Sequence, residues 1–142
     1  MSKSDIFETD FLKLILNATP IGGIADNAAT SPLTVLWLSL HTADPGEGGT
    51  QLTSEVAYTG YGRTSVNRSG GGWNVNNGVG TLMVDAVFPT GTGGSGTATY
   101  FGVGTSQTGA GKLLWSGTVT PNIPLGNGVA PVLSAGATIT ED

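Results

Sequence analysis

The side chains that could do chemistry gather around the single histidine of the chain. An apolar run, Leu38–His41, leads into the turn Asp44–Glu47, and His41 is the only histidine among 142 residues. A catalytic histidine needs a nucleophile and an orienting carboxylate, and a metal site needs several ligands at workable spacing. The chain has no cysteine and no second histidine, and no common hydrolase motif surrounds His41. We therefore expect a strand-end histidine that hydrogen-bonds the turn after it, no catalytic residue and no enzymatic activity.

The acidic residues near this histidine raise the question of a calcium site. Asp44, Glu47 and Glu55 are hard oxygen ligands, but their spacing lacks the pattern of an EF-hand loop. The segment Asp44-Pro45-Gly46 has a simpler interpretation as a turn. Proline presets φ, glycine accepts positive φ, and the aspartate can cap its own backbone two residues on. We expect neither a metal ion nor a cofactor.

Two glycine-rich stretches, 69–72 and 91–96, could be taken for phosphate-binding loops. A P-loop requires a Gly-Lys-Ser/Thr motif between a strand and a helix, and no lysine follows either stretch. Both stretches are therefore expected to be flexible hairpin loops. Asp85 interrupts an apolar segment but has no carboxylate partner nearby in the sequence, as paired acid catalysis would need.

Composition excludes several classes of partner. The net charge is −5, only 11% of residues are charged, and there are five basic residues. A nucleic-acid-binding protein needs a basic face to neutralise phosphates, which this chain cannot build. No apolar run approaches the length of a membrane span, and the first residues lack the pattern of a signal peptide. We expect no direct contact with nucleic acid or membrane.

The periodicity near the N-terminus predicts one helix over residues 4–17. Phe7, Phe11, Leu14 and Ile15 fall on one apolar stripe. We assign residues 1–32 to an N-terminal helix and arm. The stripe has two interpretations: it docks onto another subunit, or it covers one end of the chain's own β-domain.

The rest of the chain predicts short strands separated by turns. The segment 33–41 has large apolar groups on both faces, which indicates a central strand. Further strands are expected at 56–58, 63–67, 73–76, 79–88, 97–104, 112–120 and 129–140. Asn77-Gly78 predicts a two-residue hairpin turn, and 107–111 a second hairpin. The fold class is therefore all-β: an antiparallel β-sandwich over 33–142 with one short N-terminal helix, in a single compact domain overall.

The aromatic residues could line a sugar-binding surface, although such residues more often anchor a core or a subunit interface. The candidates considered for the sugar surface are Trp73, Trp115, Tyr58, Tyr61 and Tyr100. The residues we select as candidate interface residues are Phe7, Phe11, Leu14, Tyr58, Tyr61, Arg63 and Trp73.

Several short motifs, in a fixed order, carry a resemblance over residues 5–142. They are Asp5–Glu8, Leu36–Glu47, Tyr58–Arg63, Phe88-Pro89, Thr99–Val103, Gly111–Gly117 and Ala137–Thr140. Together they resemble a family of small virion proteins of tailed bacteriophages, whose members are labelled capsid decoration (cement) proteins or tail-fibre proteins. By analogy with other virion domains, the sandwich is expected to be jelly-roll-like.

The resemblance implies a structural role without catalytic residues. We expect a capsid decoration protein that bridges capsomers and so stabilises the shell to which it binds. Its expected partners are the major capsid protein and copies of itself, as a dimer or trimer. Its expected location is the capsid surface of the virion, after assembly in the host cytoplasm. The alternative is a tail-fibre or receptor-binding module.

Overall fold

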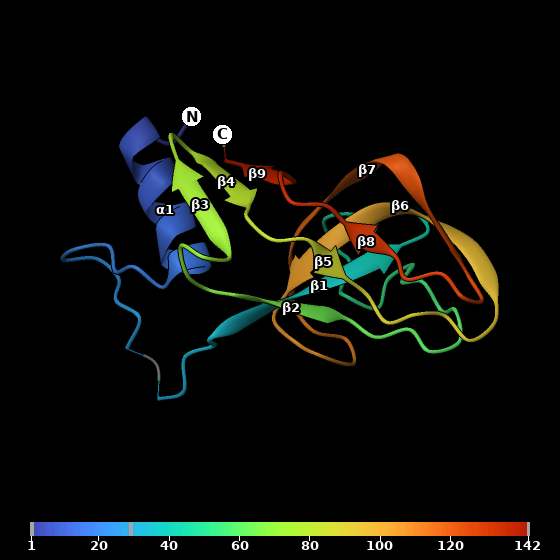
Figure 1. Ribbon diagram of the computed structural model, residues 1–142. Coiled ribbons are helices and arrows are strands. Elements are labelled where there is room, and N and C mark those ends of the chain that lie inside the picture. The colour runs from blue at the N-terminus through green and yellow to red at the C-terminus, as the bar shows by residue number, and fades with distance from the viewer. Residues whose placement is uncertain (1, 29, 142) are drawn as a thin grey trace. The chain divides into compact units, whose positions relative to one another are not determined.

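The computed structural model describes residues 2–28 and 30–141, and Figure 1 shows the path of the chain. In chain order the elements are α1 (Asp5–Asn17), β1 (Val35–His41), β2 (Thr64–Asn67), β3 (Trp73–Asn76), β4 (Val79–Leu82), β5 (Ala86–Val87), β6 (Ser95–Gly104), β7 (Leu113–Gly126), β8 (Val132–Leu133) and β9 (Thr138–Thr140). The strand pairs β1–β6, β3–β4, β4–β9, β5–β8 and β6–β7 are all antiparallel. The expected all-β sandwich with one short N-terminal helix is confirmed.

Within the described residues, the strands form sheets of four, three and two strands, in the orders β2-β1-β6-β7, β3-β4-β9 and β5-β8. A jelly roll instead distributes eight strands over two sheets. The jelly-roll-like connectivity expected by analogy is therefore not the one that these three strand orders describe.

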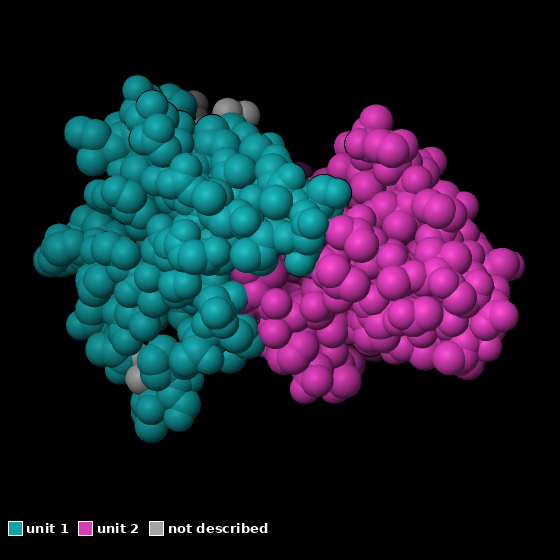
Figure 2. Space-filling model, viewed as in Figure 1, with its two compact units in different colours: residues 1–35, 67–85, 134–142 teal, residues 36–66, 86–133 magenta. Residues whose placement is uncertain are grey.

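The chain divides into two compact units, which Figure 2 shows in different colours. Unit 1 comprises residues 1–35, 67–85 and 134–142, and unit 2 comprises 36–66 and 86–133. The N-terminal helix belongs to the same unit as β3, β4 and β9, and the division at residue 32 expected from the sequence stays a prediction. Whether the units fold as the single domain expected from the sequence stays a prediction.

Unit 1 is built by α1 lying on the β3–β4 hairpin. Ser4 caps the helix by accepting a hydrogen bond from the Phe7 amide at 3.4 Å. The helix buries Leu12 and Leu16, four residues apart, whereas Phe7 is 38% exposed. The apolar stripe expected from the sequence therefore differs from the face that the helix buries. The helix has apolar residues around much of its circumference, so periodicity alone did not select the buried face.

The β3–β4 hairpin turns at Asn77-Gly78, as expected, with φ of 48° and 71°. Both residues adopt positive φ, which a type I′ turn requires. Two hydrogen bonds tie the hairpin to the helix: the Gly78 amide donates to Thr9 Oγ1 at 2.8 Å, and Asn17 Nδ2 donates to the Trp73 carbonyl at 3.0 Å.

Unit 2 is built around β1, which lies between β2 and β6 as a central strand. Leu38 pairs with Val103 and Leu40 with Phe101, and all four side chains are buried. The expected second hairpin is confirmed, since β6 pairs with β7 from Gly104 and Leu113 outward.

Three expected strands are absent or divided. Residues 56–58 lie between turns and form no strand. The segment 129–140 divides into β8 and β9, and the segment 79–88 divides into β4 and β5. Asp85 lies at this division, where its Oδ1 accepts a hydrogen bond from the Ala135 amide at 2.7 Å. Local β propensity could not anticipate a side chain that holds a distant backbone amide.

Candidate functional site

His41 ends β1 in the interior of unit 2, with none of its surface exposed. Its Nδ1 lies 2.8 Å from the Thr53 carbonyl, and its Nε2 lies 2.9 Å from Ser39 Oγ. A carbonyl only accepts, so Nδ1 carries the proton and Nε2 of the neutral ring accepts from the Ser39 hydroxyl. Burial lowers the pKa of His41, which favours this neutral form. His41 lies at the end of its strand, as expected, but its partner after the strand is Thr53, 12 residues on, and not the expected turn at Asp44–Glu47.

A buried ion pair lies beside this histidine. Arg63 binds Glu55 with two parallel hydrogen bonds, from Nε to Oε1 at 2.7 Å and from Nη2 to Oε2 at 2.8 Å. The same guanidinium donates to the carbonyls of Ser106 at 2.9 Å and Gly109 at 2.7 Å. Both side chains are nearly inaccessible to solvent. Arg63 therefore joins the segment after β1 to the loop between β6 and β7.

Tyr61 extends the network toward β1. Its hydroxyl donates to Glu55 Oε1 at 2.8 Å and accepts from the Leu40 amide at 3.2 Å. Burial raises the pKa of Tyr61, so the phenol stays protonated and remains a donor to the carboxylate. Its ring stacks on Phe88 with centroids 6.4 Å apart, and Tyr58 meets it edge-on at 5.4 Å.

Gln51 also connects the loop after β1 to the loop between β6 and β7. It is fully buried, and its Oε1 accepts from the Ser106 amide at 3.0 Å. Its own backbone amide donates to the Gly111 carbonyl at 3.0 Å. These buried polar groups have their partners inside unit 2 and link its loops to one another.

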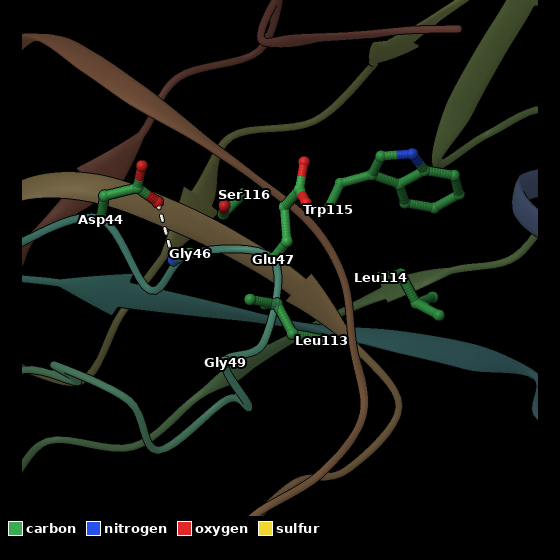
Figure 3. Close-up of a pocket in the computed structure, with 8 residues that line it drawn as sticks. All are labelled: Asp44, Gly46, Glu47, Gly49, Leu113, Leu114, Trp115 and Ser116. Carbon is green, nitrogen blue, oxygen red and sulfur yellow. Dashed lines mark hydrogen bonds between the residues drawn. The ribbon is translucent and has the colours of Figure 1, made fainter.

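On the surface of unit 2, the turn after β1 and the first residues of β7 enclose a groove of about 390 Å³ (Figure 3). The groove is lined by Asp44, Gly46, Glu47, Gly49, Leu113, Leu114, Trp115 and Ser116. Figure 3 shows the carboxylates of Asp44 and Glu47 on one side and the indole of Trp115 on the other. Two carboxylates and an aromatic side chain thus line the same groove.

Local sequence explains why the turn holds its shape. Asp44 Oδ1 accepts from the Gly46 amide at 2.9 Å, which is the expected cap two residues on. Gly46 adopts a φ of 71°, a conformation in which a side chain would be strained. Pro45, between them, is buried. The conformation of the turn is thereby fixed by its own residues.

The charge of the groove is unusual for its unit. Residues 36–66 and 86–133, all of them described, contain three acidic residues: Asp44, Glu47 and Glu55. Glu55 is buried against Arg63, so the two exposed carboxylates of unit 2 both lie in the groove. In the sequence, Trp115 and these acids lie in separate motifs. Trp115 and the acidic residues come to line one groove through the pairing of β7 with β6, and no short-range spacing in the sequence predicts this.

The residues selected as candidate interface residues fall into two groups. Trp73 is 1% exposed, Tyr58 4% and Arg63 7%, so the chain's own interior occupies their surfaces. Tyr61 is partly buried in the aromatic cluster described above. The remaining three, on α1, are accessible: Phe7 is exposed, and Phe11 and Leu14 are partly exposed. For all seven residues, a role at an interface stays a prediction.

Within residues 2–28 and 30–141, no cluster of three or more histidine, cysteine or acidic side chains is arranged to hold a metal ion. In the same described part of the chain, no helix has both the length and the apolar character needed to span a bilayer.

Comparison with known families supplies what geometry alone does not. Residues 4–141 match the family described as Podophage GP4 fiber I protein gp80. The chain belongs to this family. It is thereby a member of a family of phage virion structural proteins, which confirms the broader part of the resemblance found in the sequence. The family's description names a fibre protein and does not refer to capsid decoration. No curated protein matches the chain.

Proposed function

We propose that this chain is a structural subunit of a phage virion fibre. The observation that carries the proposal is the family match, which spans residues 4–141 and therefore both compact units. The family's description favours the tail-fibre alternative over the capsid decoration role expected from the resemblance. The expected locations at the capsid surface and against the major capsid protein have no comparable support.

In this proposal the chain acts by contact and not by catalysis. Both ring nitrogens of His41 are engaged, with Ser39 and Thr53. The buried carboxylate of Glu55 is held in place by Arg63 and Tyr61. Groups that could have transferred protons therefore support the fold. A low charge and a β-rich structure suit a protein that builds a particle through its surfaces.

The partners in this proposal are copies of the same chain and other components of the fibre. The accessible apolar residues of α1 support a docking role for the helix. Ile6 is 76% exposed and lies beside Phe7, and the Phe7 ring contacts Phe11 with centroids 6.5 Å apart. An exposed apolar patch of this kind is a common mark of a protein–protein contact. A dimer or trimer, as expected from the sequence, would be the unit in solution.

The fibre proposal is tested by the copy number and location of the chain in particles. Purified virions are separated into heads and tails, and the chain is quantified in each fraction against the major capsid protein by mass spectrometry. A fibre subunit is expected in the tail fraction in a few copies per particle. Recovery with the heads at hundreds of copies per particle would contradict the proposal and support the decoration role.

A further inference from the structure

We propose that the groove of unit 2 is a binding site for a neutral saccharide. The proposal deepens the fibre function, because a fibre that contacts a host needs a recognition surface. The biological purpose of the site rests on the proposed fibre function. The binding itself does not, since the groove lies within one compact unit and saccharide binding can be measured on the isolated chain.

The lining matches the two-sided chemistry of a sugar ring. A pyranose presents an apolar C–H face and a rim of hydroxyl groups. The Trp115 indole, with Leu113 and Leu114, supplies apolar surface, and aromatic side chains give large contact area at low entropic cost. Asp44, Glu47 and Ser116 supply oxygen acceptors for hydroxyl protons. The cavity volume of about 390 Å³ lies within the range typical of small-molecule sites.

The charge of the groove selects neutral over anionic ligands. Both exposed carboxylates of unit 2 face the cavity, so a phosphate or a second carboxylate would meet like charge. Of the two basic residues in unit 2, Arg63 is buried against Glu55, and Lys112 is not among the lining residues. An anionic ligand therefore has no cationic partner at this site. Hydrogen bonds from neutral hydroxyls to a carboxylate are, by contrast, strengthened by the charge of the acceptor.

Hydrogen bonds within unit 2 also hold the loops that form the groove. The turn is capped by Asp44, and the loop that carries it is held by the hydrogen bond between His41 and the Thr53 carbonyl. Gln51 and Arg63 join the same loop to the segment before β7, through Ser106, Gly109 and Gly111. A site whose walls are fixed in advance loses less entropy when a ligand binds.

The test is a pair of NMR titrations on the full chain labelled with nitrogen-15. The two probes, methyl β-D-glucoside and methyl β-D-glucuronide, share a ring and differ by one carboxylate. Methyl glycosides of galactose, mannose and N-acetylglucosamine extend the neutral set. At least one neutral glycoside is expected to shift the amide signals of residues 44–49 and 113–116 in a saturable way. The glucuronide is expected to bind at least about threefold more weakly than the glucoside, because of like-charge repulsion.

Two groove variants and one control localise the site. Glu47→Gln keeps the shape of the side chain and removes its charge, and should weaken binding about threefold. Trp115→Ala removes the aromatic platform and should weaken binding about tenfold. Asp26→Asn, an exposed carboxylate of unit 1, is the matched control and should leave the affinity unchanged.

The outcomes separate this inference from the fibre proposal. No saturable shift with any neutral glycoside, tighter binding of the glucuronide, or equal loss in Asp26→Asn would each overturn the saccharide site. If Trp115→Ala fails to fold, Glu47→Gln still decides the question, because its side chain is exposed on a turn. Recovery of the chain with heads would contradict the fibre function and leave the measured saccharide affinity standing.

Discussion

Arg63 binds Glu55 through two parallel hydrogen bonds of 2.7 and 2.8 Å, and both side chains are almost fully buried. The guanidinium also binds two carbonyls of the loop between β6 and β7. The side chain of Arg63, which lies just before β2, thus connects the loop after β1 to the loop between β6 and β7. One wall of the groove is part of the loop after β1, and the other is the start of β7, which follows the loop that Arg63 binds, so this pair supports the proposed binding site.

Replacing Arg63 by Met is expected to destabilise unit 2 by about 3–5 kcal/mol, because it leaves the carboxylate of Glu55 buried without its cation. The free energy of unfolding is measured by urea titration followed by circular dichroism. Arg63→Lys keeps the charge but cannot form both bonds to the carboxylate, so it should recover only part of the loss.

A double variant separates the two contributions. Arg63→Met combined with Glu55→Gln removes the uncompensated charge and should be more stable than Arg63→Met alone. A double variant that is less stable by the full sum of the two single losses would show that the residues do not act as a pair.

His41 predicts a specific dependence of stability on pH. Burial lowers the pKa of His41 below its ordinary value of 6.5, so the unfolded chain takes up a proton first as the pH falls. The contribution of His41 to the free energy of unfolding is therefore fully present above pH 6.5. It declines as the pH falls from 6.5 toward the lower pKa of His41 in the folded state. The slope is at most about 1.4 kcal/mol per pH unit.

His41→Gln provides the comparison for that dependence. The variant should be less stable at neutral pH, and the difference between wild type and variant should shrink between about pH 7.5 and pH 5.5. Unfolding curves at both pH values provide the measurement. A difference that stays constant across this window would contradict the neutral buried histidine.

Gly80 on β4 marks the close approach of α1 to its hairpin. A Cβ built there would collide with Leu16 Cδ1. Gly80→Ala is therefore expected to cost about 1–3 kcal/mol, as overpacked cores do. Gly22→Ala is the matched control, since a Cβ at Gly22 meets nothing within 4 Å. Adding Leu16→Val to Gly80→Ala should restore part of the loss in thermal unfolding, and equal losses at Gly80 and Gly22 would contradict the contact.

Arg68 closes the C-terminal end of α1. Its guanidinium donates to the Leu14 carbonyl at 2.8 Å and the Ile15 carbonyl at 2.7 Å, where the helix has no basic residue of its own. Arg68→Met should cost about 1–3 kcal/mol, because two helix carbonyls lose a charged donor. Hydrogen exchange should rise in the last turn of α1 and stay unchanged in β6 and β7. Unchanged exchange in α1 would show that the helix end is held by other contacts.

Local signals predicted those parts of the structure that local forces decide. The Asn77-Gly78 turn, the helix over residues 5–17 and the Asp44 cap all follow from preferences within a few residues. The buried face of α1 did not, because it depends on where the hairpin lies, and Leu12 and Leu16 were not selected. The groove was not predicted for the same reason, because Glu47 and Trp115 are far apart in the sequence and line one groove through strand pairing.

The most direct test of the fibre function is to see where the chain lies on the particle. Intact virions are labelled with a gold-conjugated antibody raised against the purified chain and are imaged by electron microscopy. For a fibre subunit, gold is expected on fibres of the tail, in small numbers per particle. Gold distributed over the surface of the head would contradict it.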